Sequence, residues 1–212
     1  NSSWGGAYYS KIAQDAARYA HDRGTVFVAS AGNDGGDVIN FSPAGNERAI
    51  SVGAVDVNDA RSFGYWSSNY GARLDVTGPG VDILSTKATN GTCLGYPAVG
   101  SGYCRVPGTS LSGPFVAGLA GLLLSKYPSL TNEEVRQILR TSSTDIGTPG
   151  FDVYYGYGRI NAANAMRMAA SKPLAPIINN PISRTTISGV KSFMGSVSGP
   201  DFANYTLEAG LG

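Results

Sequence analysis

Apolar residues recur along the first 170 positions of the chain in two alternating patterns. Residues 10–23 have the three- and four-residue spacing of an amphipathic helix, and Gly24 follows as a helix stop. The predicted apolar face of this helix consists of Ile12, Ala13, Ala16, Ala17 and Ala20. Short apolar runs follow at residues 25–30, 49–55 and 74–76, and they predict strands that are buried on both faces.

Three further helices are predicted after these strands. Residues 114–126 are apolar on almost every side, which indicates a helix enclosed within the domain rather than one on its surface. Thr131 and Glu134 have the spacing of a capping box that opens an amphipathic helix. Asn161 is expected to cap a last helix that runs through Ala170. Buried strands that alternate with helices predict an α/β fold, in which a parallel sheet lies between layers of helices.

The pattern changes after residue 170. Residues 171–182 contain several prolines and are predicted to be a linker between two domains. Residues 183–212 alternate weakly and show no helical period, so we expect them to begin a β-rich accessory domain. Residues 1–170 then form the α/β domain.

Composition and charge narrow the classes of function. Hydrophobic residues make up 42% of the chain, which is enough for a packed core. The net charge is +1 and neither sign forms a block, so we expect neither nucleic-acid nor membrane partners. The 29 glycines together with only 15% charged residues favour a loop-rich extracellular enzyme.

The two cysteines, Cys93 and Cys104, lie in a segment rich in glycine and tyrosine. A metal site would need more ligands nearby, and the one histidine, His21, is distant in the sequence. We therefore predict a disulfide that closes a short loop, with two free thiols as the alternative. A disulfide would indicate an oxidising compartment and a secreted protein.

Ser110 follows a glycine-rich turn directly before the predicted apolar helix. This position places it at the positive end of a helix dipole, where backbone N–H groups have no helical partner. A serine nucleophile needs such surroundings, because its own N–H can bind the developing oxyanion while Oγ attacks a carbonyl. The alternative is a serine that only caps the helix.

Asn33 follows the predicted strand at residues 25–30, at the end where open α/β sheets bind their ligands. Its side-chain amide has N–H groups to donate to an oxyanion. The alternative is a turn of asparagine, aspartate and glycine without a further role.

Together these segments resemble the subtilisin-like serine proteases, the subtilases. The nucleophile motif of that family reads Gly-Thr-Ser-Met-Ala-x-Pro-His-Val-Ala-Gly, and residues 108–118 match it except at Leu111, Ser112 and Phe115. Residues 31–35 resemble the family's Ala-Gly-Asn-x-Gly, which supplies the oxyanion asparagine. Other segments that resemble the family occur in its order at residues 1–6, 41–44, 51–55, 75–80 and 155–161.

The resemblance covers residues 1–170 and implies a serine endopeptidase that cleaves polypeptides through a Ser-His-Asp triad. It implies that Ser110 is the nucleophile and that Asn33 donates to the oxyanion. The substrate-binding residues that it implies are Ser3, Trp4, Gly5, Ser30, Ala31 and Gly32. The glycines of these walls predict room for a large substrate side chain, and Asp34 favours a basic one.

The family's aspartate and histidine motifs, Asp-Ser/Thr-Gly and His-Gly-Thr, are absent from the chain. Both precede the serine in family order, so we expect them before residue 1, in a missing N-terminal part of the same domain. The chain alone is then expected to be inactive. His21 is expected to be a solvated residue near the end of a surface helix rather than the base of the triad.

Two other functions are compatible with parts of the sequence. A non-catalytic binding protein on the same scaffold would also lack the two triad motifs. The residues around Ser110 approach the Gly-x-Ser-x-Gly turn of α/β-hydrolases, but Ser112 stands where that motif has glycine. That family also places its histidine after the serine, and no histidine follows Ser110 here.

The chemistry implied by the resemblance requires no cofactor. Many subtilases bind structural calcium, and the candidate site here consists of carbonyl groups near Ala44 together with Asp75. No dense cluster of carboxylates supports this calcium site.

Overall fold

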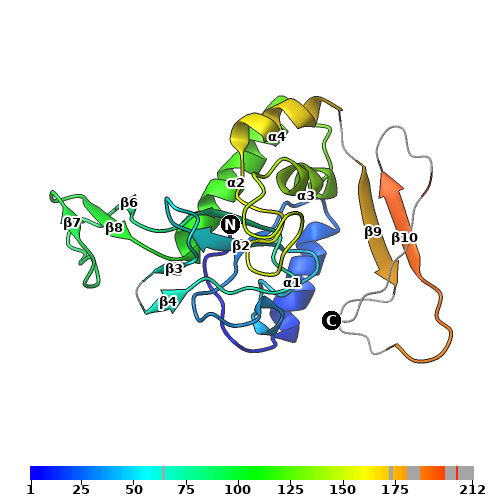
Figure 1. Ribbon diagram of the computed structural model, residues 1–212, viewed down its shortest axis with the longest axis horizontal. Coiled ribbons are helices and arrows are strands. Elements are labelled where there is room, and N and C mark those ends of the chain that lie inside the picture. Colours follow the sequence, from blue (N-terminus) through cyan, green and yellow to red (C-terminus); the bar gives the residue numbers. More distant parts are fainter. Residues whose placement is uncertain (64, 172–173, 181–186, 199–203, 205–212) are drawn as a thin grey trace.

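The computed structural model describes residues 1–63, 65–171, 174–180, 187–198 and 204. Figure 1 shows a main body of helices around a short sheet, a β-arm on one side and a two-stranded sheet on the other. The elements of the main body position the cavity described below.

A parallel sheet of three strands lies at the centre of the main body. Its strands are β1 (Val28–Ser30), β2 (Ile50–Val55) and β5 (Val76–Pro79), in the order β1-β2-β5. All six residues of β2 are buried, which explains why its sequence is a continuous apolar run rather than an alternating one. Ser2 extends the sheet through a parallel bridge to Ala29 of β1. The predicted α/β fold with a parallel sheet is confirmed.

Successive residues of the strands point into two cores, one on each face of the sheet. On one face, the sheet packs against α2 (Thr109–Lys126), α3 (Asn132–Thr141) and α4 (Ala162–Met168). On the other face, Ala29 packs against a loop region that contains Val38 and Phe41. The short 3-10 helices η1 (Val38–Asn40) and η2 (Ala169–Ser171) belong to these two layers.

The β-arm is an antiparallel sheet between β5 and α2 in the sequence. Its strands are β6 (Ile83–Thr86), β7 (Ala98–Val99) and β8 (Tyr103–Val106), with β8 in the middle. The predicted disulfide between Cys93 and Cys104 is present in this arm. A separate hairpin is formed by β3 (Ser62–Phe63) and β4 (Trp66–Ser67).

The predicted apolar face of the first helix is right at Ala17 but wrong at Ile12 and Ala16, which are exposed. The helix α1 (Lys11–His21) begins after the capping residue Ser10, but Ile12 is 84% exposed, whereas Gln14 and Ala17 are buried. Gln14 is buried because its side chain donates to Ser42 Oγ over 3.2 Å and accepts a hydrogen bond from Asn46 Nδ2. This side of α1 packs against polar side chains, so the spacing of the alanines did not identify it as the buried side.

His21 is not the solvated residue that we expected. Its side chain is only 11% exposed, and its Nε2 atom lies 3.9 Å from Glu133 Oε2 on α3. Asn132 donates to the backbone carbonyl of His21 over 2.8 Å, which holds the end of α1 against the start of α3. The ring is mostly covered because the C-terminus of α1 lies against this helix.

Helix α2 differs from its prediction at its start and on its outer face. It begins at Thr109, so Pro114 lies inside the helix rather than in its first turn. One side packs on the sheet, but Phe115 is 46% exposed and Leu122 is 50% exposed. The expectation of a helix enclosed on all sides is therefore wrong for the described structure. The capping box at Thr131 and the asparagine cap at Asn161 are confirmed.

The C-terminal strands β9 (Ala175–Asn180) and β10 (Met194–Ser198) pair antiparallel. Strand β9 lies within residues 171–182, where the sequence indicated a linker. Most of the predicted β-rich domain at residues 183–212 lies outside the described residues, so the domain division stays a prediction. In the part of the chain that the structure describes, no helix has the length and apolar character needed to cross a membrane.

Candidate active site

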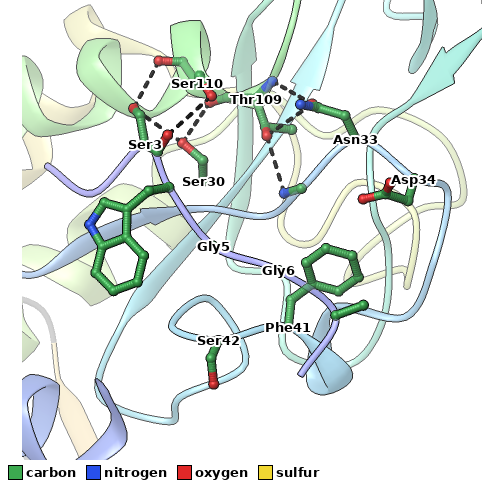
Figure 2. Close-up of a pocket in the computed structure, with 13 residues that line it drawn as sticks. Ser3, Gly5, Gly6, Ser30, Asn33, Asp34, Phe41, Ser42, Thr109 and Ser110 are labelled. Carbon is green, nitrogen blue, oxygen red and sulfur yellow. Dashed lines mark hydrogen bonds between the residues drawn. The ribbon is translucent and has the colours of Figure 1, made fainter. Parts of the chain in front are cut away.

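A cavity of about 340 Å³ opens beside the start of α2. Four segments line it: residues 3–7, the end of β1 and the turn after it at residues 30 and 32–34, residues 41–42, and residues 109–110. Figure 2 shows Ser110 and Thr109 on one side of this cavity and Phe41 and Ser42 on the other. The cavity therefore lies at the carboxyl end of a parallel strand, where α/β sheets bind ligands.

Most of the residues predicted from the sequence meet in this cavity. Those that line it are Ser3, Trp4, Gly5, Ser30, Gly32, Asn33, Asp34 and Ser110. Ala31 does not, because its side chain is fully buried in the core beneath the turn. The sequence analysis did not assign Gly6, Ala7, Phe41, Ser42 or Thr109 to the site, although all of these except Ala7 lie within motifs that it had noted.

Ser110 is the second residue of α2 and does not cap it. The N-cap is Gly108, whose φ of 135° lies in the left-handed region that favours glycine, and no side chain caps the helix there. Ser110 Oγ lies 3.4 Å from the backbone oxygen of Ser3. The interpretation of Ser110 as a capping serine is therefore wrong, and its hydroxyl lies at the cavity.

Thr109 fixes the orientation of the Asn33 side chain. Asn33 Oδ1 accepts hydrogen bonds from the Thr109 backbone N–H over 2.9 Å and from Thr109 Oγ1 over 3.0 Å. Because a backbone N–H can only donate, the oxygen of the amide must face Thr109. The Nδ2 group of Asn33 is then the end of the amide that remains to donate to a ligand.

Thr109 also joins the first turn of α2 to the end of β1. Its backbone oxygen accepts from Ser30 Oγ over 2.9 Å, and its Oγ1 accepts from the Gly32 N–H over 3.1 Å. Thr109 is buried. The relative positions of Asn33 and Ser110 are thus set by direct hydrogen bonds between the two segments that carry them.

The glycines of the cavity wall are required for internal packing. A Cβ at Gly32, whose φ is 103°, would approach the Phe41 ring to 2.9 Å and would also collide with Asn69. A Cβ at Gly5 would approach the backbone oxygen of Ser42 to 2.6 Å. These glycines make room for neighbouring residues of the chain. They do not support the expected room for a large substrate side chain.

No imidazole or carboxylate hydrogen-bonds to Ser110 within the described ranges of the chain. His21 lines a different depression, together with Asp22, Gly24, Arg48, Leu130, Thr131 and Asn132. The one histidine of the chain is therefore not placed beside the nucleophile candidate.

Asp75 is not available to the calcium site suggested by the sequence. Its carboxylate is fully buried and accepts from Arg136 Nε over 2.8 Å and from Arg140 Nε over 2.7 Å. Burial by itself would raise the pKa of Asp75, but the two guanidinium groups outweigh it and hold the pKa below its ordinary value. Among the described residues, no group of three or more His, Cys, Asp and Glu side chains is placed to hold a metal ion.

Comparison with known proteins identifies the family. The model of the subtilase family matches residues 1–158. The chain belongs to the subtilase family. Subtilases are serine endopeptidases.

Individual relatives agree with the family match. This subtilase is 41% identical over 167 residues to a thermophilic serine proteinase of Bacillus sp. (strain AK1), a match that covers 78% of this chain and 37% of that protein. It is 39% identical over 168 residues to subtilisin BL of Lederbergia lenta, covering 79% and 55% of the two chains. A solved protease structure from Pseudoalteromonas arctica PAMC 21717 is 32% identical with a TM-score of 0.66, covering 78% and 49%. The subtilase chain thus spans about half the length of these relatives, or less.

Proposed function

We propose that the protein containing this chain is a subtilisin-type serine endopeptidase in which Ser110 is the nucleophile. The observation that carries the proposal is the shared cavity of Ser110 and Asn33, in which Thr109 orients the Asn33 amide. Ser110 has a backbone N–H in the first turn of α2, where helices leave N–H groups without helical partners. The proposal therefore assigns two donors to the oxyanion, the Asn33 side-chain amide and the Ser110 backbone N–H.

The reaction that this arrangement supports is acyl transfer. Ser110 Oγ attacks the carbonyl carbon of a peptide bond and gives its proton to a base, and the carbonyl oxygen becomes an oxyanion. Asn33 Nδ2 and the Ser110 N–H donate to that oxyanion. The C–N bond then breaks as the leaving amine takes the proton, and water releases the acyl group from Ser110 in the same way.

The base is proposed to be a histidine, paired with an aspartate, from a part of the protease outside these residues. The described residues place no base beside Ser110, and the relatives are longer than this chain. The exposed Phe115 and Leu122 on the outer face of α2 would be covered by that additional part. No cofactor enters this reaction, and a structural calcium ion outside the Asp75 site is compatible with the proposal.

Polypeptides are the proposed substrates. Ser2 uses its backbone groups to pair with β1, through bonds of 2.8 Å to Val28 and 3.0 Å from Ser30. Ser3, Trp4 and Gly5 continue this extended segment along the cavity, which suits pairing with an extended substrate backbone. The disulfide in the β-arm supports a secreted protein, because such bonds persist in oxidising compartments.

The proposal is tested by replacing Ser110 with alanine in the intact protease. Peptidase activity should fall by roughly a million-fold in kcat, as for the nucleophile of a subtilisin, because the acyl-enzyme can no longer form. Labelling by a fluorophosphonate probe should disappear with it. Undiminished labelling of the Ser110→Ala protein would refute the assignment. An intact wild-type protein that neither labels nor cleaves peptides would instead favour a non-catalytic binding protein.

A further inference from the structure

A proline lies where helix α2 would normally complete a hydrogen bond to the nucleophile residue. In an α-helix the N–H of one residue donates to the carbonyl four positions earlier. The residue four positions after Ser110 is Pro114, which has no N–H. The backbone carbonyl of Ser110 therefore lacks its ordinary helical donor.

The hydroxyl of Ser3 takes the place of that donor. Ser3 Oγ donates to the Ser110 carbonyl oxygen over 2.9 Å, although the two residues are 107 positions apart in the sequence. Figure 2 shows the two residues facing each other at the edge of the cavity. Their contact is reciprocal, because Ser110 Oγ lies 3.4 Å from the backbone oxygen of Ser3.

Neighbouring side chains direct the single proton of the Ser3 hydroxyl. Asn1 Nδ2 donates to Ser3 Oγ over 3.0 Å, and Ser30 Oγ approaches it at 3.4 Å. A hydroxyl has one proton and two lone pairs. Asn1 occupies one lone pair of Ser3, and Ser30 gives its own single proton to the Thr109 carbonyl. The Ser3 proton is then directed to its nearest acceptor, the Ser110 carbonyl oxygen at 2.9 Å, rather than to Ser30 Oγ at 3.4 Å.

We propose that Ser3 is a positioning residue for Ser110. The Ser3 hydroxyl replaces the hydrogen bond that Pro114 cannot donate to the Ser110 carbonyl. This inference rests on the proposed role of Ser110 as nucleophile. It assigns the side chain of Ser3 to the helix rather than to substrate. The segment at residues 1–5 and the first turn of α2 are thereby joined at the residue where the reaction begins.

A double-mutant cycle in the intact protease tests the proposal. Ser3→Ala should slow fluorophosphonate labelling of Ser110 by about three- to tenfold, the range expected for one neutral hydrogen bond. The loss should appear in kcat for peptide hydrolysis and leave KM nearly unchanged. Pro114→Ala restores a helical N–H, so in that background Ser3→Ala should change the rate by less than about twofold.

Ser112 supplies the matched control. Its Oγ donates to the Thr109 carbonyl over 3.0 Å, and in a helix the Gly113 N–H donates to that same carbonyl. Ser112→Ala removes a hydroxyl bond from the same turn without involving Pro114. Its effect should therefore be the same whether residue 114 is proline or alanine.

An effect of Ser3→Ala that is equal in both backgrounds would overturn the proposal. If the Pro114→Ala protein does not fold, the proposal is tested by comparing Ser3→Thr with Ser3→Val. These side chains have nearly the same shape, but only threonine has a hydroxyl. Threonine should label at least three times faster than valine, and equal rates would refute the positioning role.

Amide hydrogen exchange separates this inference from the proposed function. Ser3→Ala should speed exchange in the first turn of α2 when residue 114 is proline, and not when it is alanine. This readout requires no catalysis. A wild-type protein that is not labelled would refute the assignment of Ser110 as nucleophile. The exchange rates of the wild type, the two single mutants and the double mutant would still show whether Ser3 holds the Ser110 carbonyl.

Discussion

Two residues far apart in the sequence, Asn33 and Ser110, are brought to one cavity by the contacts of Thr109. The motif around Ser110 and the turn at Asn33 were identifiable from sequence because each stands in a local pattern. The burial of Ala31 could not be identified in this way, because neighbouring residues of an extended chain point to opposite sides. The motif does not say which of its residues points into the core. The packing role of Gly32 depends on Phe41, and no local pattern joins the two.

Replacing Asn33 with alanine in the intact protease should lower kcat by about 10² to 10³, with little change in KM. The donor acts on charge that develops only in the transition state, so ground-state binding is preserved. Thr109→Val should cause a smaller loss, because the Thr109 N–H still holds the Asn33 oxygen. Steady-state kinetics on a peptide substrate measure both. A normal kcat for Asn33→Ala would show that Asn33 only forms a turn.

At the scale of the elements, local signals were reliable and long-range ones were not. The capping box of α3 was predicted because both of its residues lie within one turn. The start of α2 was missed because proline is common in the first turn of a helix, so Pro114 suggested that the helix begins there. The helix instead begins at Thr109, and the Ser110 carbonyl, which Pro114 cannot bond, accepts from Ser3. The burial of Gln14 on α1 was missed because its side chain finds polar partners in a distant loop.

The ion pairs between α3 and Asp75 predict a pH dependence of folding. The pKa of Asp75 is lowered in the folded protein, so its stabilising contribution is present above the unfolded pKa of about 3.9. It is lost as the pH falls through the lower folded value. Asp75→Asn should lower the free energy of unfolding of the intact protein at pH 7 by about 3–5 kcal/mol, because it leaves buried guanidinium charges unpaired.

Urea unfolding at pH 7 and below pH 4 measures this difference. The gap between wild type and Asp75→Asn should narrow at the lower pH. Asp15→Asn is the control, because the Lys11–Asp15 pair is exposed and its loss should cost less than about 1 kcal/mol. Equal costs for the two substitutions at pH 7 would show that the buried pairs contribute no more than a surface pair.

For the whole molecule, the sequence predicted the α/β class because buried strands and helices alternate along it. It could not predict which loops cover the second face of the sheet, since that depends on contacts such as those among Ala29, Val38 and Phe41. It also could not predict that α2 would expose Phe115 and Leu122, because an evenly apolar helix has no sequence signal for its outer face.

These 212 residues expressed alone should show no peptidase activity above background. Without a neighbouring base to accept its proton, the Ser110 hydroxyl is a poor nucleophile. The exposed apolar residues of α2 should also promote self-association, which light scattering detects. Proteolysis by the isolated chain that disappears on Ser110→Ala would contradict the proposal that the base comes from elsewhere.

The disulfide of the β-arm has a consequence for the proposed peptidase activity. Leu94 is 84% exposed and lies inside the loop that Cys93 and Cys104 close. Exposed loops are preferred sites of nicking, including by a neighbouring copy of the same enzyme. A nick between the two cysteines would leave Ser110 covalently attached to the N-terminal segment that carries Asn33. Self-digested enzyme should therefore migrate as one band without reductant and as two bands with it. The nicked protein should stay active until its disulfide is reduced.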